Sequence, residues 1–600
     1  MLRLKNATWL VALYLLGTSL AKADPDTINL SRDLVRLGIA SQNLTPYDPS
    51  LDARPLFQAA VEYVKAHGTH SVTLDHGAYY FLTPQNETSY LFFNGLSDLT
   101  VDLAGSAIYF ADALHQGFSF TDCQRFTLRN FKIDFLSPPY TYVTLASLDP
   151  AQRTLAYTLL PNWPDPASFN GATALAGPLV LWAAVFREGH IVEATSRMHV
   201  AEPIANHVLQ LVQDNTPWTQ SPTLSTLRPG DKIIVTARGG PPPVIGTRGD
   251  SITIADVTVH GSSGFGVFLN VVSNSTVDHV RVMPRPGNLI STNADGIHLG
   301  DSGQNNHVRN CFVTDTLDDA LAIDSLHLAT VLSQNGSRQL TVERNAYLHF
   351  PNGTAIHFVD PSTDQELAGA TIVSQNPPDS TPPVFDGTVT ITFDQDLPAL
   401  AQGSEMVSAG PDSRGAGSSI ENNVVGEVPF GRGIWVGGAE GVKIESNSIG
   451  HTSNGAIEVF EDTSTKAYPV PPAHDIVIQG NLIRGSLGPM ASGSGTQIAL
   501  AAISVVSINA TNDFVPTMPN TNIFIRDNLI FDSGRCGIWV GGLDQGAIEH
   551  NSIYGYDEYP ELPLFGVSPA VATQLLEDFK QPIVVHYSQN IQVSGNVSSQ

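Results

Sequence analysis

The sequence predicts an all-β protein, a right-handed parallel β-helix with an N-terminal capping helix and two inserted small β modules. At 600 residues the chain exceeds what one hydrophobic core usually supports, whereas a solenoid lengthens without thickening. Its composition, with 14% charged residues, 51 Gly and 40 Pro, suits many short strands joined by tight turns. Short strand-turn-strand segments also recur along the chain, which is typical of stacked coils.

The clearest copies of this internal repeat are GRGIWVGGAEGVKIESNSI at 431–449 and GRCGIWVGGLDQGAIEHNSI at 534–553. Each copy alternates apolar and polar residues over short stretches and closes them with Asn, Asp or Gly, which is the pattern of strands and turns. Units of roughly 20 to 30 residues that cannot bury a face alone become stable only when they stack, so the repeat predicts the coils of a solenoid.

Two segments are predicted to be helices. Residues 52–68, DARPLFQAAVEYVKAHG, have an amphipathic pattern with Pro55 in the first turn and Gly68 just past the end. We expect this helix to cap the open N-terminal end of the solenoid and to shield its edge strands. Towards the other end, SPAVATQLLEDFK indicates a short helix with Ser568 as its N-cap and Pro569 behind it.

Two regions break the repeat and divide the chain into parts. They contain GDKIIVTARGG and TVTITFDQDLPALAQGSEMVS, and we expect both to be small β modules inserted between coils. The predicted order is a signal peptide at 1–23, a cap and first coils at 24–139, an inserted module at 140–240, central coils with the candidate catalytic aspartates at 241–325, a second inserted module at 326–416, and C-terminal coils at 417–600.

The first residues have the pattern of an export signal, so we expect a secreted, extracellular protein. Arg3 and Lys5 precede an apolar run, and Ala21-Lys22-Ala23 forms a small-x-small cleavage site. No other stretch reaches the ~18 apolar residues that a membrane span requires. In a eukaryotic secretory pathway some Asn-x-Ser/Thr sequons would carry glycans. These sequons are at Asn29, Asn43, Asn86, Asn274, Asn335, Asn352, Asn509 and Asn596.

Charge and cysteine content argue against several classes of protein. A net charge of −27 would be repelled by nucleic acid and by anionic membranes, so neither is expected as a partner. Cys123, Cys311 and Cys536 are far apart and odd in number, which predicts neither a disulfide framework nor a zinc site. We expect all three to be small buried residues of the core.

The coils align on a motif of four residues, in the order small, apolar, any, apolar. Because side chains alternate across a strand, the second and fourth residues are expected to face the core and the third to face outward. That outward column contains Phe268, His298, Ala322, Trp435, Glu458 and Trp539. Aromatic rings beside His and Glu predict a sugar-binding groove, unless the inserted modules bury them as ordinary packing.

Three aspartates gather at the strand entrances in this alignment. Asp295 and Asp319 both precede the small residue of the motif, and Asp318 lies one residue further out. Neighbouring strands are ~4.8 Å apart, so these carboxylates should lie side by side. A turn or bulge at 317–319 is expected, because strict alternation would point the charge of Asp319 into the core. Each aspartate alone could instead cap a turn.

These motifs resemble those of known glycosidases. STNADGIHL followed by LDDALAI is similar to the paired Asn-Thr-Asp and Asp-Asp motifs of glycoside hydrolase family 28, the polygalacturonases of the pectin-lyase-like β-helix superfamily. The Gly-His-Gly and Arg-Ile-Lys motifs of that family are missing, and 431–433 is the nearest echo. The chain resembles glycoside hydrolase family 110 more closely, the exo-α-galactosidases of the blood-group-B α-1,3 type. FSFTDCQRFTLRNFKIDFLSPPYT, RPGNLISTNADGIHL, GRGIWV and the order of coils and inserts carry this resemblance.

The resemblance implies an inverting hydrolase in which Asp318 is the general acid and Asp295 and Asp319 activate the attacking water. Carboxyl groups of inverting sites are roughly 6.5–9.5 Å apart. Neighbouring negative charge would raise the pKa of the acid. No metal or cofactor is required.

The candidate substrate contacts, by hydrogen bonding or stacking, are His298, Arg432, Trp435, Glu458 and Asp462. Arg432 could instead neutralise a neighbouring carboxylate, and Glu458 could simply be solvated.

Three alternatives stay open at this point. A polygalacturonase-like pectin hydrolase needs a basic groove, for which the sequence offers only Arg432 and Lys443. A calcium-dependent polysaccharide lyase would bind Ca²⁺ through the aspartates and abstract a proton with Arg or Lys. A non-catalytic glycan-binding β-helix would use the same groove without chemistry. In each case the expected partner is an oligosaccharide, a polysaccharide or a glycoconjugate, and the sequence does not fix the oligomeric state.

Overall fold

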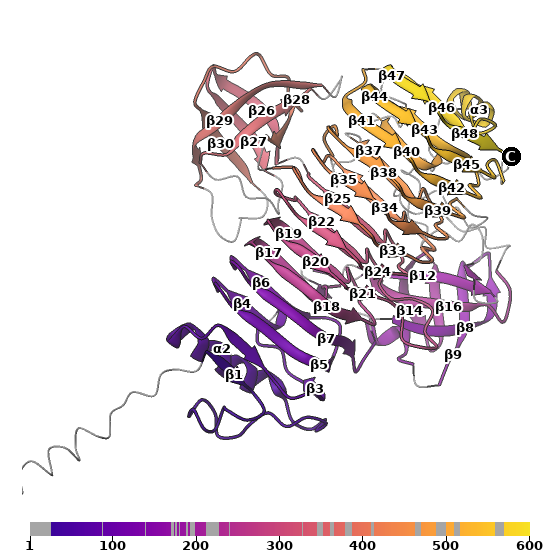
Figure 1. Ribbon diagram of the computed structural model, residues 1–600. Coiled ribbons are helices and arrows are strands. Elements are labelled where there is room, and N and C mark those ends of the chain that lie inside the picture. Colours follow the sequence, from indigo (N-terminus) through magenta and orange to yellow (C-terminus); the bar gives the residue numbers. More distant parts are fainter. Residues whose placement is uncertain are drawn as a thin grey trace, which may run out of the picture.

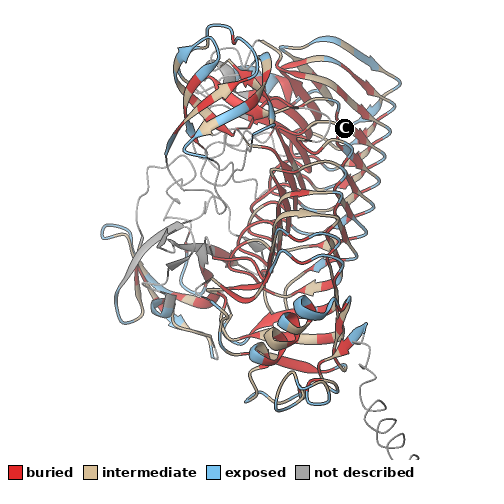
Figure 2. Cartoon of the chain, turned by 90° about the vertical axis from the view of Figure 1, so that its left-hand side faces the viewer, coloured by how far each residue is buried: buried red, intermediate tan, exposed pale blue. Residues whose placement is uncertain are grey.

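The computed structural model of the chain shows one long solenoid with two modules, which lie on opposite flanks of it in Figure 1 and project from one side of it in Figure 2. It describes residues 26–600 apart from 87, 139, 162, 170–172, 175–176, 179, 188–189, 192–197, 212–226, 239, 327, 345–351, 361–364, 379–386, 410–412, 463–469, 488–499, 509–516 and 559–568. The expected signal peptide at 1–23 and the expected N-cap Ser568 therefore lie outside the described residues.

Two long sheets form the solenoid. The 11-stranded sheet consists of β4 (Ser89–Asn94), β6 (Gln116–Thr121), β17 (Val244–Asp250), β19 (Val267–Ser273), β22 (Ile297–Gly300), β25 (Leu321–Asp324), β34 (Ile434–Gly437), β37 (Ile457–Asp462), β40 (Ala501–Ile508), β43 (Cys536–Gly541) and β46 (Ile583–His586).

The 22-stranded sheet forms the other walls of the coils. Its strands are β1 (Thr27–Asn29), β2 (Ser71–Thr73), β3 (Ala78–Phe81), β5 (Thr100–Phe110), β7 (Thr127–Phe135), β18 (Thr253–Val259), β20 (Thr276–Asp278), β21 (Arg281–Val282), β23 (His307–Arg309), β24 (Phe312–Val313), β32 (Ser419–Glu421), β33 (Val424–Val425), β35 (Lys443–Glu445), β36 (Ser448–Ile449), β38 (Val477–Gln479), β39 (Leu482–Arg484), β41 (Asn520–Arg526), β42 (Leu529–Phe531), β44 (Leu543–Glu549), β45 (Ser552–Tyr554), β47 (Gln589–Ser594) and β48 (Val597–Ser599).

The strands of the coils pair in parallel with the strand one coil away, and the predicted parallel β-helix is confirmed. In the central coils Val267 pairs with Ile297, Ile297 with Leu321 and Leu321 with Ile434. These apolar residues belong to one continuous core between the sheets, which Figure 2 shows as a buried column along the solenoid. The second and fourth residues of the four-residue motif therefore face the core, as the alternation predicts.

A ladder of asparagines runs along one corner of the core. In each step the side-chain oxygen of one Asn accepts two hydrogen bonds of about 3 Å, from the backbone N–H and the side-chain amide of the Asn one coil before it. The side-chain amide of the accepting Asn donates to a backbone carbonyl of that earlier coil. These bonds satisfy buried backbone groups at the turns, where the strand ladder is interrupted. The ladder consists of Asn423, Asn447, Asn481, Asn528, Asn551 and Asn596, and at its first step the side-chain oxygen of Asn423 accepts the backbone N–H of Cys311.

The predicted capping helix is α2 (Ala53–His67). The carboxylate of Asp52 accepts the backbone N–H of Arg54 at its start, and Gly68 adopts the left-handed conformation at its end, where a side chain would be strained. Phe57 of the helix packs against Phe81 and Phe93 of the first coils. The helix thereby closes the N-terminal end of the core, as expected from the sequence.

The second predicted helix is α3 (Pro569–Asp578). Its residue Leu575, together with Phe579 just after it, packs in one cluster with Trp539 and Val584 of the 11-stranded sheet. This cluster covers the outer face of the sheet in the last coils.

The three cysteines are buried, as predicted, and burial raises the pKa of Cys311 to about 12.

Both expected inserts are antiparallel β structures with cores of their own. The first contains a seven-stranded sheet of β8 (Tyr140–Asp149), β9 (Thr154–Leu159), β12 (Val180–Arg187), β13 (His190–Ile191), β14 (Met198–Ala205), β15 (Val208–Leu211) and β16 (Lys232–Arg238), a hairpin of β10 (Thr173–Ala174) and β11 (Gly177–Pro178), and a 3₁₀ turn at Pro166–Phe169. The second is a closed barrel of β26 (Ala329–Gly336), β27 (Gln339–Arg344), β28 (Ala355–Val359), β29 (Glu366–Asn376), β30 (Thr388–Phe393) and β31 (Glu405–Ser408).

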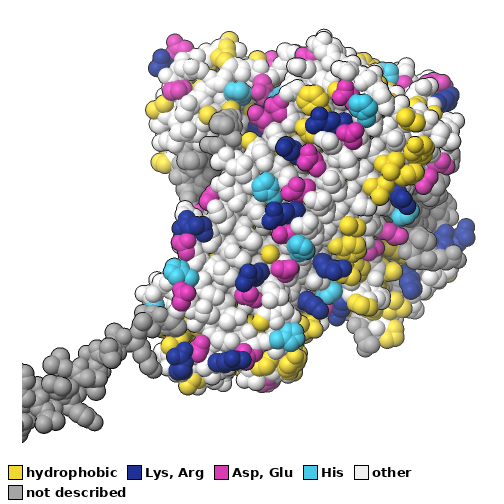
Figure 3. Space-filling model, in the orientation of Figure 1, with side chains coloured by type: hydrophobic (Ala, Val, Ile, Leu, Met, Phe, Trp, Pro, Cys, Tyr) yellow, Lys and Arg dark blue, Asp and Glu magenta, His cyan; other side chains and the backbone are white. Residues whose placement is uncertain are grey.

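Charged side chains alternate in sign on the solenoid face shown in Figure 3. Arg125 pairs with Asp98 one coil away, and Arg129 pairs with Asp102. Such exposed pairs each contribute at most about 1 kcal/mol, so they add little to the stability of the fold. Among the described helices, none has the length and apolar character needed to cross a membrane.

Candidate active site

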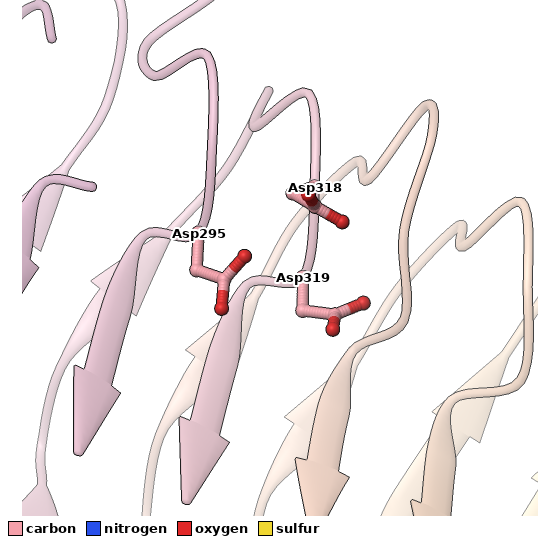
Figure 4. A group of neighbouring side chains, drawn as sticks. All are labelled: Asp295, Asp318 and Asp319. Atoms are coloured by element: carbon pink, nitrogen blue, oxygen red, sulfur yellow. The ribbon is translucent and has the colours of Figure 1, made fainter. Parts of the chain in front are cut away.

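The three predicted aspartates lie together at the entrances of two neighbouring strands (Figure 4). Asp295 precedes β22 and Asp319 precedes β25, and the backbone N–H of Gly296 donates to the Asp319 carbonyl at 3.0 Å. The pairing of Ile297 with Leu321 places the two aspartates at the same position in successive coils. The alignment made from the sequence is therefore correct in this region.

A bend before β25 turns the backbone so that Asp318 and Asp319 can both reach the outer face. The chain bends at Leu317 and Asp318, within the expected range, and the Thr316 hydroxyl donates to the Asp318 carbonyl at 2.7 Å. Thr292 makes the equivalent bond to the Ala294 carbonyl one coil earlier, at 2.6 Å. A hydroxyl at this position is thus the local device that shapes the strand entrances of the site.

Gly431 allows the next coil to approach this bend. A β-carbon built on Gly431 would lie 2.3 Å from the carbonyl carbon of Asp318 and 2.6 Å from the backbone nitrogen of Asp319. Both neighbours are backbone atoms, so they cannot move aside without moving the aspartates. The glycine at position 431 is therefore required by close packing against the aspartate pair.

One carboxylate oxygen from each of Asp295, Asp318 and Asp319 lies within 4.8 Å of the others. This closest approach is shorter than the roughly 6.5–9.5 Å between carboxyl groups of inverting glycosidases. The expected wide spacing is therefore not seen between the nearest oxygens. Asp295 and Asp319 are buried, whereas Asp318 is partly exposed, so Asp318 is the one of the three that is more open to solvent.

Arg432 holds Asp319 in place. Its backbone N–H and its Nη1 each donate to a different oxygen of Asp319 at 2.7 Å, and its Nε donates to Glu458 at 2.7 Å. Arg432 and Glu458 are 3% and 1% exposed, so neither reaches solvent as a free substrate contact would. Of the two roles considered for Arg432, the structure shows neutralisation of a neighbouring carboxylate, and the idea that Glu458 is simply solvated is wrong.

The pKa of Asp319 is set by opposing influences. Burial raises it, Arg432 lowers it, and the negative charges of Asp295 and Asp318 raise it, with a result of about 7. Burial also raises the pKa of Glu458, against the opposing influence of Arg432. A carboxyl group that changes charge near neutral pH suits a general acid or base.

His298 lies between two carboxylates. Its Nδ1 is 2.6 Å from Asp295 Oδ2, and its Nε2 is 3.0 Å from Asp324 Oδ2. Burial lowers the pKa of His298, but Asp324 and Asp295 outweigh burial and raise this pKa well above its usual value. Because the side chain is buried and both ring nitrogens face carboxylates, His298 is not placed to hydrogen-bond a sugar.

The same contacts test whether the aspartates could hold a cation. Their oxygens converge as a Ca²⁺ site would require. However, both oxygens of Asp319 accept hydrogen bonds from Arg432, and Oδ2 of Asp295 faces His298. A dication would have to displace or approach these positively charged partners. The donor set therefore does not fit a divalent cation.

The outward column exists as predicted, with one strand more than the alignment contained. Phe268, His298, Ala322, Trp435 and Glu458 follow one another in register. Ser504 of β40 then stands between Glu458 and Trp539. The missed strand carries the motif itself, as Ala502-Ile503-Ser504-Val505, so the sequence did hold the signal.

The aromatic residues of this column have different environments. Trp435 and Phe268 are half-buried, whereas Trp539 is fully buried beneath α3. The expectation that Trp539 lies exposed in a groove is therefore wrong, because the C-terminal helix covers the last coils. Phe265, which the sequence analysis missed, stacks on Phe268 with ring centroids 4.8 Å apart. Both rings contact His298 edge-on, and its ring is 6.2 Å from Trp435.

Three further charged residues are Asp462 and Lys443, which were singled out from the sequence, and Asp324, which was not. Asp462 is the last residue of β37, and its side chain lies outside the described part of the chain. Lys443 begins β35 in the 22-stranded sheet, away from the site. Asp324, the partner of His298, was missed because a carboxylate at the end of an apolar strand gives no sign of what it faces.

The inserts flank the site at opposite ends of its strands. Tyr142 and Trp163 of the first insert cluster with Leu317 and Phe430, the residues before Asp318 and Gly431. The Tyr142 hydroxyl also accepts the backbone N–H of Leu289 at 2.8 Å. The first insert therefore supports the strand entrances that carry the aspartates.

The barrel is attached at the other end, where the strands leave the site. The backbone N–H of Leu326, in the segment that leads into the barrel, donates to Asp301 at 2.9 Å. Glu366 of the barrel accepts from Arg414 at 2.6 Å, and Arg414 donates in turn to the carbonyl of Gly438, just after β34. Both ends of the site's strands are thus covered by a module.

No family model matches the chain. It is similar along most of its length to curated proteins named alpha-1,3-galactosidase. Alpha-1,3-galactosidase B of Parabacteroides distasonis is 22% identical over 581 residues, 88% of this chain and 89% of that protein. The chain resembles the α-1,3-galactosidases. Alpha-1,3-galactosidase A of Bacteroides thetaiotaomicron is 24% identical over 489 residues, 78% of this chain and 79% of that protein.

The α-1,3-galactosidase resemblance inferred from the motifs is confirmed by these relatives. A third, alpha-1,3-galactosidase A of Bacteroides fragilis, is 24% identical over 244 residues, and the match spans 38% of each chain. Among solved structures, the A-module of a mannuronan C-5 epimerase from Azotobacter vinelandii covers 92% of this chain and 97% of that chain, with a TM-score of 0.43 and 12% identity.

Proposed function

We propose that the protein is an inverting glycoside hydrolase, an exo-α-galactosidase that removes terminal α-1,3-linked galactose. The relatives support a glycoside hydrolase with a carbohydrate substrate. The observation that carries the hydrolase assignment is the convergence of three carboxylates within 4.8 Å on the outer face of the solenoid, whereas inversion is proposed from the resemblance to family 110, because this spacing is shorter than that of inverting sites. Two of them are bonded to buried basic side chains, Arg432 and His298. Such a group of carboxylates is the machinery that glycoside hydrolysis needs.

In this proposal Asp318 is the general acid and protonates the glycosidic oxygen. It is the most open of the three aspartates, so a substrate oxygen can reach it. Asp295 and Asp319 orient and deprotonate the water that attacks the anomeric carbon. Arg432 favours the ionised form of Asp319, and the pKa of Asp319 near 7 matches a base that works close to neutral pH.

Substrate binding rests on the residues that remain accessible around the aspartates. Trp435 and Phe268 are half-buried aromatic side chains on the same face, and they suit the apolar face of a pyranose ring. Asp462 remains a proposed hydrogen-bonding contact at the end of β37. Modules at both ends of the strands favour a site that takes the terminus of a glycan, which is the basis for proposing exo action.

The direct test is an activity panel with wild type, Asp318→Asn and a matched control. The control is Asp278→Asn, the same change in the other sheet. We expect wild type and the control to hydrolyse p-nitrophenyl α-galactoside and an α-1,3-galactosyl disaccharide. Asp318→Asn should lose at least about 100-fold in kcat/KM with the disaccharide, since general acid catalysis contributes about 10²- to 10⁴-fold.

Other outcomes would point to other functions. Cleavage of polygalacturonate in place of the galactosides would indicate a pectin hydrolase, although Arg432 is occupied and Lys443 lies on the other sheet. Unsaturated products that disappear with a calcium chelator would indicate a lyase. Glycan binding that Asp318→Asn leaves intact, without turnover of any substrate, would indicate a binding solenoid.

We also propose that the protein is secreted. The basic residues, the apolar run and the Ala-x-Ala site at 1–23 support this proposal. Expression of the full chain in a secreting host, followed by N-terminal sequencing of the protein in the medium, is the test. A mature protein that begins at Asp24 is expected, whereas an uncleaved N-terminus retained inside the cell would contradict it.

A further inference from the structure

The structure assigns a positioning role to His298: it is a buried imidazolium, held by Asp324, that fixes the water-activating carboxylate of Asp295. This inference rests on the proposed function, since it concerns the same site. It replaces the expectation that His298 contacts the sugar. It also adds Asp324, which no motif pointed to, to the residues that determine the rate.

The geometry gives each ring nitrogen a carboxylate partner. The Nδ1–Asp295 distance of 2.6 Å and the Nε2–Asp324 distance of 3.0 Å are both hydrogen-bond distances. A neutral imidazole has one N–H donor and one acceptor nitrogen. Its acceptor nitrogen would face an ionised carboxylate that also only accepts, so the two lone pairs would repel each other. With both carboxylates ionised, only the doubly protonated ring donates to both.

Aromatic and apolar side chains surround the ring of His298. Phe268 and Phe265 cover the ring from β19 and the turn before it, Ala322 lies beside it on β25, and Trp435 follows on β34. Among the described residues, the carboxylates bonded to the ring are those of Asp295 and Asp324, and Asp301, whose backbone N–H bonds Asp324 from behind, also interacts electrostatically with His298. With His298 7% exposed, Asp295 5% and Asp324 4%, water does not screen these contacts.

Asp324 is itself held on its far side. Its Oδ1 accepts the backbone N–H of Asp301 at 2.9 Å, and its carbonyl accepts the backbone N–H of Ser302 at 3.0 Å. Asp301 then accepts the backbone N–H of Leu326, where the chain leaves for the barrel. The clamp therefore runs from the barrel attachment through Asp324 and His298 to Asp295.

The second base has a parallel arrangement. Asp319 is bonded to Arg432, and Arg432 is bonded to Glu458, so a buried cation again stands between a site carboxylate and a carboxylate behind it. In both clamps the rear carboxylate offsets the cation and the cation favours ionisation of the front one. The two clamps thereby hold the side chains of both bases in fixed orientations towards the site.

The test combines spectroscopy with kinetics on Asp324→Asn, which keeps the shape of the side chain and removes its charge. In the wild-type protein labelled with ¹⁵N-histidine, the signal absent from His298→Gln should show both ring nitrogens protonated at neutral pH. In Asp324→Asn the same ring should be neutral at neutral pH, with its proton on Nδ1. A wild-type His298 that is neutral at neutral pH would overturn the inference, whatever the enzyme hydrolyses.

The kinetic arm separates positioning from substrate contact. Asp324→Asn should lower kcat for p-nitrophenyl α-galactoside by about 10- to 100-fold, below the full contribution of a general base, and leave KM within about 3-fold. The acidic limb of its kcat/KM profile should move to higher pH, because Asp295 is then less readily ionised. Asp278→Asn, which removes a carboxylate beside exposed His279, should change neither quantity.

Two kinetic results would contradict the inference. One is a large rise in KM with kcat unchanged, which would make His298 a substrate contact. The other is an Asp324→Asn enzyme with the wild-type rate and pH profile. If wild type hydrolyses no α-galactoside, the proposed function fails, while the protonation state of His298 still tests the clamp.

Discussion

Removing the proposed general acid should make the protein more stable while it abolishes activity. In Asp318→Asn one of three crowded negative charges is lost. With oxygens within 4.8 Å and an effective dielectric constant of about 20, each ionised pair repels by about 3 kcal/mol. Attraction between Asp318 and Arg432 and the partial exposure of Asp318 offset much of this repulsion. We therefore expect a net gain of about 1–2 kcal/mol at neutral pH.

The gain should depend on pH in a defined direction. Asp318 contributes to raising the pKa of Asp319 to about 7, above the ordinary value of about 3.9 in an unfolded chain. A carboxyl whose pKa is raised by folding costs stability as pH rises from the unfolded value to the folded one. The advantage of Asp318→Asn should thus be absent near pH 4 and complete above about pH 7.

Urea unfolding of wild type and Asp318→Asn at these two pH values measures the effect without the ionic screening that guanidinium adds. Asp278→Asn provides the opposite control. Burial raises the pKa of Asp278, but the hydrogen bond from Asn310 and the charge of Arg309 outweigh burial and lower this pKa. Loss of the Asp278 carboxylate should therefore not stabilise the protein. A loss of more than about 1 kcal/mol for Asp318→Asn at neutral pH would contradict net repulsion among the three carboxylates, as would an equal gain near pH 4.

Three more predictions follow from single contacts. Gly431→Ala should lower kcat/KM for p-nitrophenyl α-galactoside by about 100-fold or more, because the added β-carbon displaces the Asp318 backbone. Gly336→Ala is the control and should leave kcat/KM unchanged, because a β-carbon at Gly336 lies in open space. Asn447→Ala should destabilise the fold by about 2–4 kcal/mol in urea, since it leaves buried partners in the ladder unpaired. Hydrogen bonds from His474 and His357 and the charge of Arg414 outweigh burial and hold the pKa of Glu366 well below its usual range, so wild type should lose stability as pH falls below about 4. Glu366→Gln should lack this dependence, and thermal unfolding at a series of pH values decides between the two.

Much of the fold was predictable because the solenoid repeats one simple pattern. The capping helix followed from Pro55 and Gly68, and the core column followed from the alternation of small and apolar residues around Ile297 and Leu321. The missed strand at Ala501–Ile508 carried the same motif but lay in a long apolar run without a turn signal. Local pattern therefore determined the coils wherever turn residues marked their ends.

The candidate site was predictable in its aspartates and less so in their partners. Register placed Asp295, Asp318 and Asp319 together, since neighbouring coils lie at a fixed spacing. The burial of Trp539 was not predictable, because it depends on α3, which packs back onto the sheet from a later part of the chain. The pairing of His298 with Asp324 was missed for a similar reason: strand alternation gives the face of a side chain but not its hydrogen-bond partner.

The stereochemistry of the released sugar decides whether these three aspartates form an inverting α-galactosidase site. Proton NMR of the anomer first released from an α-1,3-galactosyl disaccharide tests it most directly. We expect wild type to release β-galactose, which then mutarotates, and Asp318→Asn to release none under the same conditions. Initial release of α-galactose would show a retaining reaction and contradict the assigned roles, and release of β-galactose by Asp318→Asn at the wild-type rate would exclude Asp318 as the acid.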